Sequence, residues 1–274
     1  DYGNGMPNRM QGWKQANKNF KIAGIRTSVS TTSTNLTITY RLQEIGSKYH
    51  VSYTLYPSGM LHVACHLEAQ PNAPELPRIG ARFRIPADMN QLEYFGRGPE
   101  ENYCDRKNGT LIGYYKSTAE QQYVPYVRPQ ENGHKTDVRW LALMDKTGKG
   151  LLLVADSNFM EFNVSRNRVE DFDSEESNRA YQWQNFTKDE PLDPDKAKNR
   201  KPKQTHVNDI FPRNFVEVCL DHRMMGVAGD DSWGSQPYLK YRLPTNKDYH
   251  WSFTILPIKN NTEINEKLRY QYLP

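Results

Sequence analysis

The stretch Leu36-Thr37-Ile38-Thr39-Tyr40 decides the fold, because large apolar side chains alternate strictly with threonines along it. Alternation with a period of two places successive side chains on opposite faces of an extended chain, and it is typical of a half-buried β-strand. The same alternation continues through Val51, Tyr53 and Leu55, with serine and threonine between them. This pattern predicts strands that cover an apolar core with one face.

Similar runs recur along the chain, separated by turn signals such as Pro57-Ser58-Gly59. They span residues 60–68, 79–85, 92–95, 111–115, 138–144, 150–155, 159–164, 215–220, 239–243 and 249–258. Spacings of roughly a dozen residues favour an antiparallel sandwich. We expect no amphipathic helix between them, and we expect Asp1–Gln11 to be a glycine-rich loop.

Composition limits the class of protein. The 274 residues carry 36 basic and 32 acidic side chains, a net charge of +4 that favours a neutral ligand over nucleic acid. No apolar run approaches the roughly 20 residues of a membrane helix, so we expect no membrane partner either. The three cysteines are far apart, which argues against a disulfide framework. The compartment, cytoplasmic or periplasmic, stays open.

The stretch Gly226-Val227-Ala228-Gly229-Asp230-Asp231-Ser232-Trp233-Gly234 predicts a specific tight loop. Glycine permits positive φ, and aspartate hydrogen-bonds neighbouring backbone groups. Trp233 has no apolar neighbour in this loop, which indicates an indole presented to a ligand. The alternative, an indole folded back into the core, is equally compatible with the residues alone.

Four runs in order resemble the C-terminal domain of the large β-galactosidases of glycoside hydrolase family 2. They are Asp1–Gly5, Arg97–Arg106, Tyr123–Gly133 and Asp221–Gly234. The sequence departs from the family pattern at Met224, where many relatives carry Gln, and at Cys104, where Pro is common. Residues 185–204 look like an insertion.

The resemblance implies an all-β fold, a large antiparallel two-sheet supersandwich like that of galactose mutarotases. Residues 1–258 would form a single domain that lacks its first strands, and residues 259–274 a peripheral tail. The family's catalytic glutamates lie in an upstream barrel domain, so we expect no catalytic residue here and no activity from this fragment alone. The only Asn-Glu pair, Asn265-Glu266, lies in the tail and is interpreted as coincidence.

The resemblance also implies the site and the partners. Trp233 matches the tryptophan that forms a platform for the sugar or aglycone. We expect Gly3, Asn4, Gly5, Asp230, Asp231 and Ser232 in loops near the active site. The two aspartates are expected to hydrogen-bond the backbone of their own loop rather than to contact the sugar. The family's Mg and Na ions bind mainly outside this domain, so none is expected here. The expected partners are a β-galactoside, the upstream barrel and further copies in a homo-oligomer.

Other chemistries fit the residues less well. His62 and His66 could form a metal pair on a helix, but on a strand they lie about 13 Å apart, so we expect no metal site. A free-standing mutarotase would need a His and a Glu on neighbouring strands, whereas Glu131, Asn132 and His134 are interpreted as structural loop residues. A carbohydrate-binding module would need several coplanar exposed aromatic residues. Both alternatives to a β-galactosidase domain stay open.

Overall fold

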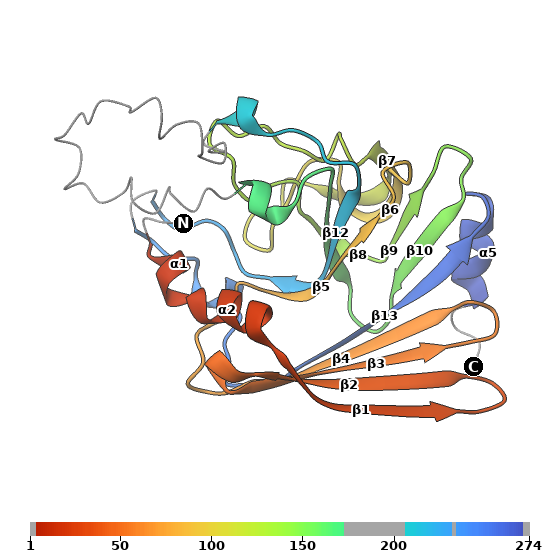
Figure 1. Cartoon of the computed structure of the whole chain (residues 1–274). Coiled ribbons are helices and arrows are strands. Elements are labelled where there is room, and N and C mark those ends of the chain that lie inside the picture. Colours follow the sequence, from red (N-terminus) through yellow and green to blue (C-terminus); the bar gives the residue numbers. More distant parts are fainter. Residues whose placement is uncertain (1–3, 173–205, 232–233, 271–274) are drawn as a thin grey trace, which may run out of the picture.

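The computed structural model describes residues 4–172, 206–231 and 234–270, and these form two antiparallel sheets. The larger sheet has nine strands in the order β1-β2-β3-β4-β13-β10-β9-β6-β7, and the smaller has four in the order β5-β12-β11-β8. Figure 1 shows the smaller sheet packed above the bend of the larger one. The predicted all-β, two-sheet architecture is confirmed.

The strand bounds agree with most of the predicted runs. The larger sheet contains β1 (Lys21–Val29), β2 (Thr34–Leu42), β3 (Ser47–Leu55), β4 (Leu61–Glu68), β6 (Gln91–Gly98), β7 (Leu111–Thr118), β9 (Trp140–Met144), β10 (Gly150–Ala155) and β13 (Tyr249–Ile258). The smaller sheet contains β5 (Arg78–Ile85), β8 (Lys135–Val138), β11 (Met160–Ser165) and β12 (Val216–Met224).

The main core lies between the two sheets and follows from the alternation. On β4, Val63 and Cys65 are buried in the cluster that also takes Phe162 of β11 and Leu220 of β12. Cys65 is therefore the small core residue that its position in the strand pattern predicts, and its thiol is free. The intervening positions of β4 face away from this core.

Two helices lie at the beginning of the described chain, and the first of them replaces part of the loop expected there. They are α1 (Met6–Arg9) and α2 (Gln11–Asn19). Trp13 Nε1 donates to the carbonyl of Pro74 at 2.8 Å, and Ala16 is fully buried. A Cβ on Gly12 would lie 3.1 Å from Ile45. The loop expected over Asp1–Gln11 is wrong at Met6–Arg9, and distant contacts hold α2 despite the low helix propensity of its glycine.

Two further segments differ from the predictions. Residues 239–243 were expected to form a strand, but they contain the 3-10 helix η5 (Leu239–Tyr241) between Pro237 and Pro244. The tail beyond residue 258 was expected to be peripheral, yet it forms α5 (Glu263–Tyr270), whose Ile264 is buried against the outer face of β9, β10 and β13. The remaining short helices are η1 (Gln43–Ile45), η2 (Val169–Phe172) and η4 (Val207–Asp209).

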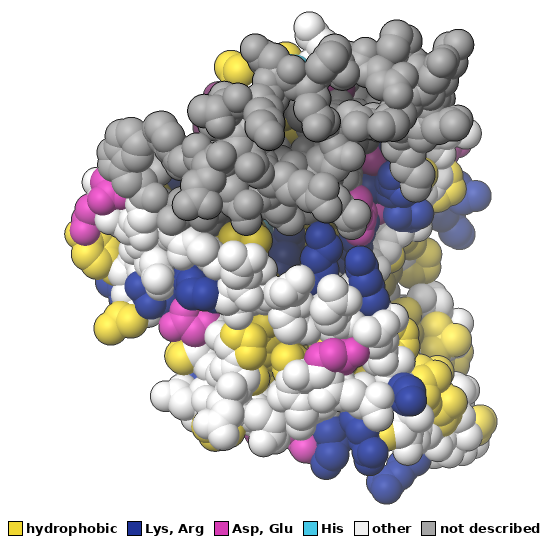
Figure 2. Space-filling view, turned by 60° about the vertical axis from the view of Figure 1, so that its left-hand side comes forward, with side chains coloured by type: hydrophobic (Ala, Val, Ile, Leu, Met, Phe, Trp, Pro, Cys, Tyr) yellow, Lys and Arg dark blue, Asp and Glu magenta, His cyan; other side chains and the backbone are white. Residues whose placement is uncertain are grey.

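The described surface carries charges of both signs. On the face in Figure 2, lysine and arginine side chains lie in separate groups with acidic, apolar and uncharged side chains between them. Within the described ranges, no helix has the length and hydrophobicity needed to span a bilayer.

Candidate functional site

The candidate site is the loop that follows β12, where two glycines allow the backbone to come close to its neighbours. A Cβ on Gly226 would lie 2.6 Å from Oδ2 of Asp105, and a Cβ on Gly229 would lie 2.5 Å from the carbonyl of Ser235. Neither glycine is among the described residues with positive φ. Close approach, and not the positive φ expected from the sequence, explains glycine at these two positions.

Asp230 and Asp231 hold the loop from inside. Asp231 Oδ1 accepts from the amides of Gly234 at 3.0 Å and Ser235 at 3.2 Å, and its Oδ2 accepts from the Ser235 hydroxyl at 2.8 Å. Asp230 Oδ1 accepts from the Tyr238 hydroxyl at 2.6 Å. Asp231 therefore hydrogen-bonds the backbone of the loop, as predicted, while Asp230 hydrogen-bonds the side chain of Tyr238.

The first described residues of the chain meet this loop. Asn4 donates from its side chain to the carbonyl of Ser235 at 3.5 Å, and its Oδ1 accepts from the Met6 amide at 3.0 Å. Gly5 precedes α1 with a φ of 71°, which a residue with a side chain rarely adopts. The structure thus brings two of the predicted loops together across more than 200 residues. Gly3, Ser232 and Trp233 lie outside the described residues.

A third segment, within the Arg97–Arg106 run, supports the loop from the other side. Asp105 Oδ2 accepts from the Ala228 amide at 2.8 Å, and Cys104 Sγ donates to the carbonyl of Met224 at 3.4 Å. Cys104 and Met224 are the two positions that depart from the family pattern, so the departures face each other. A pocket of about 210 Å³ opens beside this contact, lined by residues 104–109 and Tyr241.

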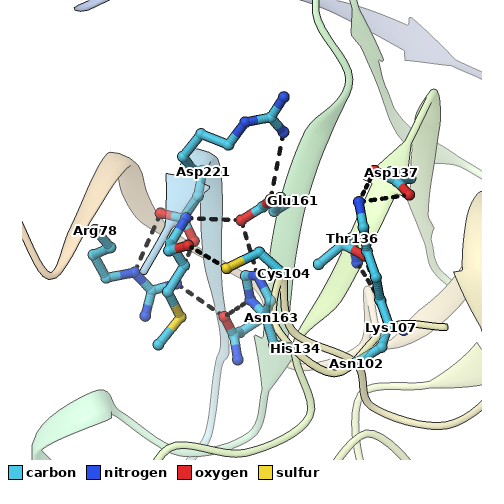
Figure 3. Close-up of polar contacts among 12 residues, drawn as sticks. Arg78, Asn102, Cys104, Lys107, His134, Thr136, Asp137, Glu161, Asn163 and Asp221 are labelled. Atoms are coloured by element: carbon cyan, nitrogen blue, oxygen red, sulfur yellow. Dashed lines mark hydrogen bonds and ion pairs between the residues drawn. The ribbon is translucent and has the colours of Figure 1, made fainter. Parts of the chain in front are cut away.

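The same run is fixed to the smaller sheet beneath it. Asn102 is fully buried, and its Oδ1 accepts from the backbone amide of Thr136 at 2.9 Å and from the Thr136 hydroxyl at 2.6 Å. Lys107 Nζ donates to Asp137 at 2.8 Å, and Arg97 Nε donates to the same carboxylate at 2.6 Å. Asp137 has a φ of 54°, so two cations hold a backbone conformation that non-glycine residues seldom adopt. Figure 3 shows the Asn102–Thr136 and Lys107–Asp137 contacts side by side.

A buried polar cluster connects the long loop before β8 to the end of β12 (Figure 3). Arg78 Nε donates to Asp221 Oδ1 at 3.2 Å, and Arg78 Nη2 donates to Asn163 Oδ1 at 2.9 Å. His134 contacts the same Asn163 oxygen through Nδ1 at 2.8 Å. Burial raises the pKa of Asp221, against the opposing charge of Arg78. These contacts fix the end of β12 and therefore the direction in which the chain enters the glycine loop.

His134 also contacts Glu161 of β11, with Nε2 and Oε2 3.2 Å apart, and Glu161 Oε2 accepts from the Met224 amide at 2.8 Å. Burial by itself would lower the pKa of His134, but the hydrogen bond and charge of Glu161 outweigh it, and the pKa is raised. His134 lies in the loop directly before β8, as the sequence predicts, and beside the neighbouring strand β11. Because this pair is fully buried, it fixes the backbone at Met224 and cannot exchange protons with a sugar.

Glu131 and Asn132 join the same cluster, as the structural interpretation of these loop residues expected. Asn163 Nδ2 donates to Glu131 Oε1 at 2.6 Å and to the carbonyl of Asn132 at 2.7 Å. Sequence reasoning assigned no role to Asn102, Asp105 or Asp137, although two of them belong to the Arg97–Arg106 run. Their partners lie 34, 123 and 30 residues away, so only the run itself could have indicated them.

The chain is similar to β-galactosidases along most of its length. A family model described as "Beta galactosidase small chain" matches residues 1–255. The β-galactosidase of Priestia megaterium is 29% identical over 262 residues, which is 94% of this chain and 22% of the relative. That of Halalkalibacterium halodurans is 30% identical over 208 residues, 75% of this chain and 18% of the relative. The chain spans about a fifth of the length of these curated relatives.

Solved structures show weaker likeness. A GH36 α-galactosidase from Geobacillus stearothermophilus superposes with a TM-score of 0.43 at 9% identity, covering 88% of this chain and 28% of that chain. A galactose mutarotase related enzyme from Lactobacillus acidophilus superposes with a TM-score of 0.36 at 11% identity, covering 88% of this chain and 72% of that chain.

Proposed function

The chain belongs to the β-galactosidase small-chain family, and on that premise we propose that it is the C-terminal part of a β-galactosidase whose active-site mouth it completes. In this proposal the parent protein hydrolyses terminal β-D-galactosides with retention of configuration. Its two catalytic carboxylates, which retaining hydrolysis needs about 5–5.5 Å apart, belong to a barrel domain upstream. This chain supplies recognition and no catalytic residue.

The observation that carries the proposal is the bracing of the loop on both sides of Ser232 and Trp233. Asp231 binds the amides of Gly234 and Ser235, Asp105 binds the amide of Ala228, and Asn4 contacts Ser235. The loop's own Asp231 and two segments distant in sequence therefore hold the residues that flank positions 232 and 233. Such bracing suits a side chain that must be held in place for a ligand before the ligand arrives.

In this function Trp233 forms a platform for the sugar or aglycone on the leaving-group side. An indole face packs against the C–H groups of a galactoside, while other groups bind its hydroxyls. Asp230, Asp231, Ser232, Gly3, Asn4 and Gly5 frame that platform. The family's Mg and Na ions would be held mainly by other domains, and the parent would assemble as a homo-oligomer.

The free-standing alternatives receive less support. His134 contacts Glu161 of β11 from the end of the 123–134 loop, and the complete burial of this pair does not fit a mutarotase acid and base. The proposal predicts no turnover of a chromogenic β-galactoside by the purified 274-residue chain, and turnover by the full polypeptide from its own reading frame. Activity of the isolated chain that a substitution within it abolishes would contradict the proposal.

The platform role is tested by Trp233→Ala in the full polypeptide. Loss of the aromatic contact should weaken inhibitors that carry an aglycone by about 1–3 kcal/mol, a factor of roughly 5 to 150, and should leave free galactose much less affected. The melting temperature is the control, since an exposed ring contributes little to the core. A large fall in melting temperature with unchanged aglycone affinity would instead indicate a core tryptophan.

A further inference from the structure

Three histidines form a row on the outer face of the nine-stranded sheet. His50 of β3 is paired in register with His66 of β4, and His66 is paired with His250 of β13. Directly opposed residues on neighbouring strands have Cβ atoms about 4.5–5.5 Å apart on one face. The alternate residues of these strands enter the core, so all three imidazoles face away from it.

The three rings lie nearly parallel. The centroids of His50 and His66 are 5.5 Å apart with an interplanar angle of 23°, and those of His66 and His250 are 4.0 Å apart with an angle of 16°. Two carboxylates contact the row, one at His50 and one at the middle histidine, His66. His50 Nε2 lies 2.8 Å from Glu68 Oε1, and His66 Nε2 lies 3.1 Å from Asp248 Oδ2.

These five residues make two overlapping donor sets. One contains His50, His66 and Glu68, the other His66, Asp248 and His250, and within each set one donor atom per residue lies within 4.8 Å of the others. Bonds of about 2.0–2.2 Å to a common ion require donors closer than this. Four of these side chains are partly exposed, from 26% for His50 to 47% for Asp248, and His250 is exposed as well, so small ring and carboxylate rotations can close the gap.

Neighbouring groups hold the donors in place by hydrogen bonds, as the outer partners of metal ligands do. His50 Nδ1 is 3.0 Å from the Thr39 hydroxyl, which leaves Nε2 directed at Glu68. The second oxygen of Glu68 is 3.2 Å from Lys48 Nζ, and Asp248 Oδ1 accepts from the Ala69 amide at 3.0 Å. Each carboxylate thus keeps one oxygen for a histidine.

We propose that His66, together with either His50 and Glu68 or His250 and Asp248, forms a binding site for one divalent transition-metal ion of the zinc type. Imidazole nitrogens with a carboxylate oxygen suit zinc, nickel and copper, whereas calcium and magnesium require sites made of oxygen. Because His66 belongs to both donor sets, the row holds one ion and not two. None of these five residues belongs to the loops of the proposed galactoside function.

The test is titration of the untagged 274-residue chain with Zn²⁺ by calorimetry, and with Co²⁺ by its visible absorption. We expect one ion per chain. His66→Gln should weaken Zn²⁺ binding by at least about tenfold, the lower end of what altered outer-shell partners alone cost metal sites. The matched control is His62→Gln, on the same face of the same strand, where the imidazole has Asp156 at 2.9 Å and should not affect binding.

Two more variants, His50→Gln and His250→Gln, complete the test, with circular dichroism to verify that each variant folds. Weakened binding in either one supports the proposal and identifies the donor set that holds the ion. Absence of saturable binding by the unaltered chain would overturn it. Equal affinity of the His66→Gln and His62→Gln variants would overturn it as well.

Discussion

His134 and His62 each contact a carboxylate at hydrogen-bond distance, 3.2 Å to Glu161 and 2.9 Å to Asp156, but in opposite surroundings. His134 lies directly before β8 of the smaller sheet and is fully buried, while the His62 side chain is 36% exposed on the outer face of the larger sheet. The buried pair has further fixed partners and holds the end of β12. The exposed pair can rearrange. An imidazole and a carboxylate therefore form a fixed support beside one sheet and an adjustable surface pair on the other.

The comparison predicts its largest effect for the charges of the buried cluster. Asp221→Ala removes the carboxylate that faces Arg78, whose guanidinium then remains among buried groups without its main counter-charge. Leaving one member of a buried ion pair unpaired costs about 3–5 kcal/mol of unfolding free energy. Urea unfolding monitored by tryptophan fluorescence measures this change.

The control for that prediction is His62→Gln, which removes the half-exposed member of the surface pair. Solvent screens such a pair, so the expected change in unfolding free energy is less than about 1 kcal/mol. Similar losses for Asp221→Ala and His62→Gln would show that burial does not distinguish the two regions.

A second contrast sets the glycine loop against the open edge of the larger sheet. Gly226→Ala places a methyl group 2.6 Å from Asp105 Oδ2 and 3.0 Å from Tyr241 Cβ. Forcing an extra group into such a packed contact costs about 1–3 kcal/mol of stability. In the full polypeptide, the same change should weaken aglycone binding, because it moves the loop away from Asp105.

Gly24→Ala provides the matched control, since a Cβ at Gly24 of the edge strand β1 meets no atom within 4 Å. Its unfolding free energy should be unchanged or slightly increased. Comparison of the melting temperatures of Gly226→Ala and Gly24→Ala tests this difference in packing. An unperturbed Gly226→Ala variant would mean that the loop is not packed against Asp105 as described.

The sequence predicts the strands well because their signal is local. Alternation such as that of residues 36–40 reports directly which face of a strand is buried. It fails where packing with distant residues decides the outcome. Helix α2 depends on contacts of Trp13 with Pro74 and of Gly12 with Ile45. Leu239, Tyr241 and Leu243 alternate like a strand, yet Leu239 is 77% exposed and begins a 3-10 helix.

The candidate site divides in the same way. The backbone contacts of Asp231 span three and four residues, so turn chemistry alone predicts them. The contact of Asp105 with Ala228 spans 123 residues and requires the fold. The row of histidines requires even more, because spacing along one strand correctly separates His62 from His66 but says nothing of His50 and His250. Only the register across β3, β4 and β13 brings those residues together.

The smallest expected effect concerns two histidines with opposite pKa shifts. Burial, followed by the charge of Arg223, lowers the pKa of His222 to about 4, whereas the hydrogen bond that His62 donates to Asp156 raises the pKa of His62. An unfolded histidine has a pKa near 6.5. The contribution of His222 is therefore present above about pH 6.5 and is lost as the pH falls toward 4. The contribution of His62 is present below about pH 6.5 and is lost as the pH rises through its folded pKa.

Unfolding free energies at pH 5 and pH 8 for the unaltered chain, His222→Phe and His62→Gln test these two signs. The unfolding free energy of His222→Phe minus that of the unaltered chain should be larger at pH 5 than at pH 8. We expect a difference of about 1 kcal/mol after allowing for solvent screening of a partly exposed group. For His62→Gln the same difference should be smaller at pH 5 than at pH 8, by a few tenths of a kcal/mol. The reason is that the ion pair of His62 in the unaltered chain exists only when the imidazole is protonated. Phenylalanine keeps the ring that packs near Trp251, so the pH-dependent difference isolates the charge. Differences of the same sign in both variants would contradict the assignment of one histidine to the interior and the other to an exposed ion pair.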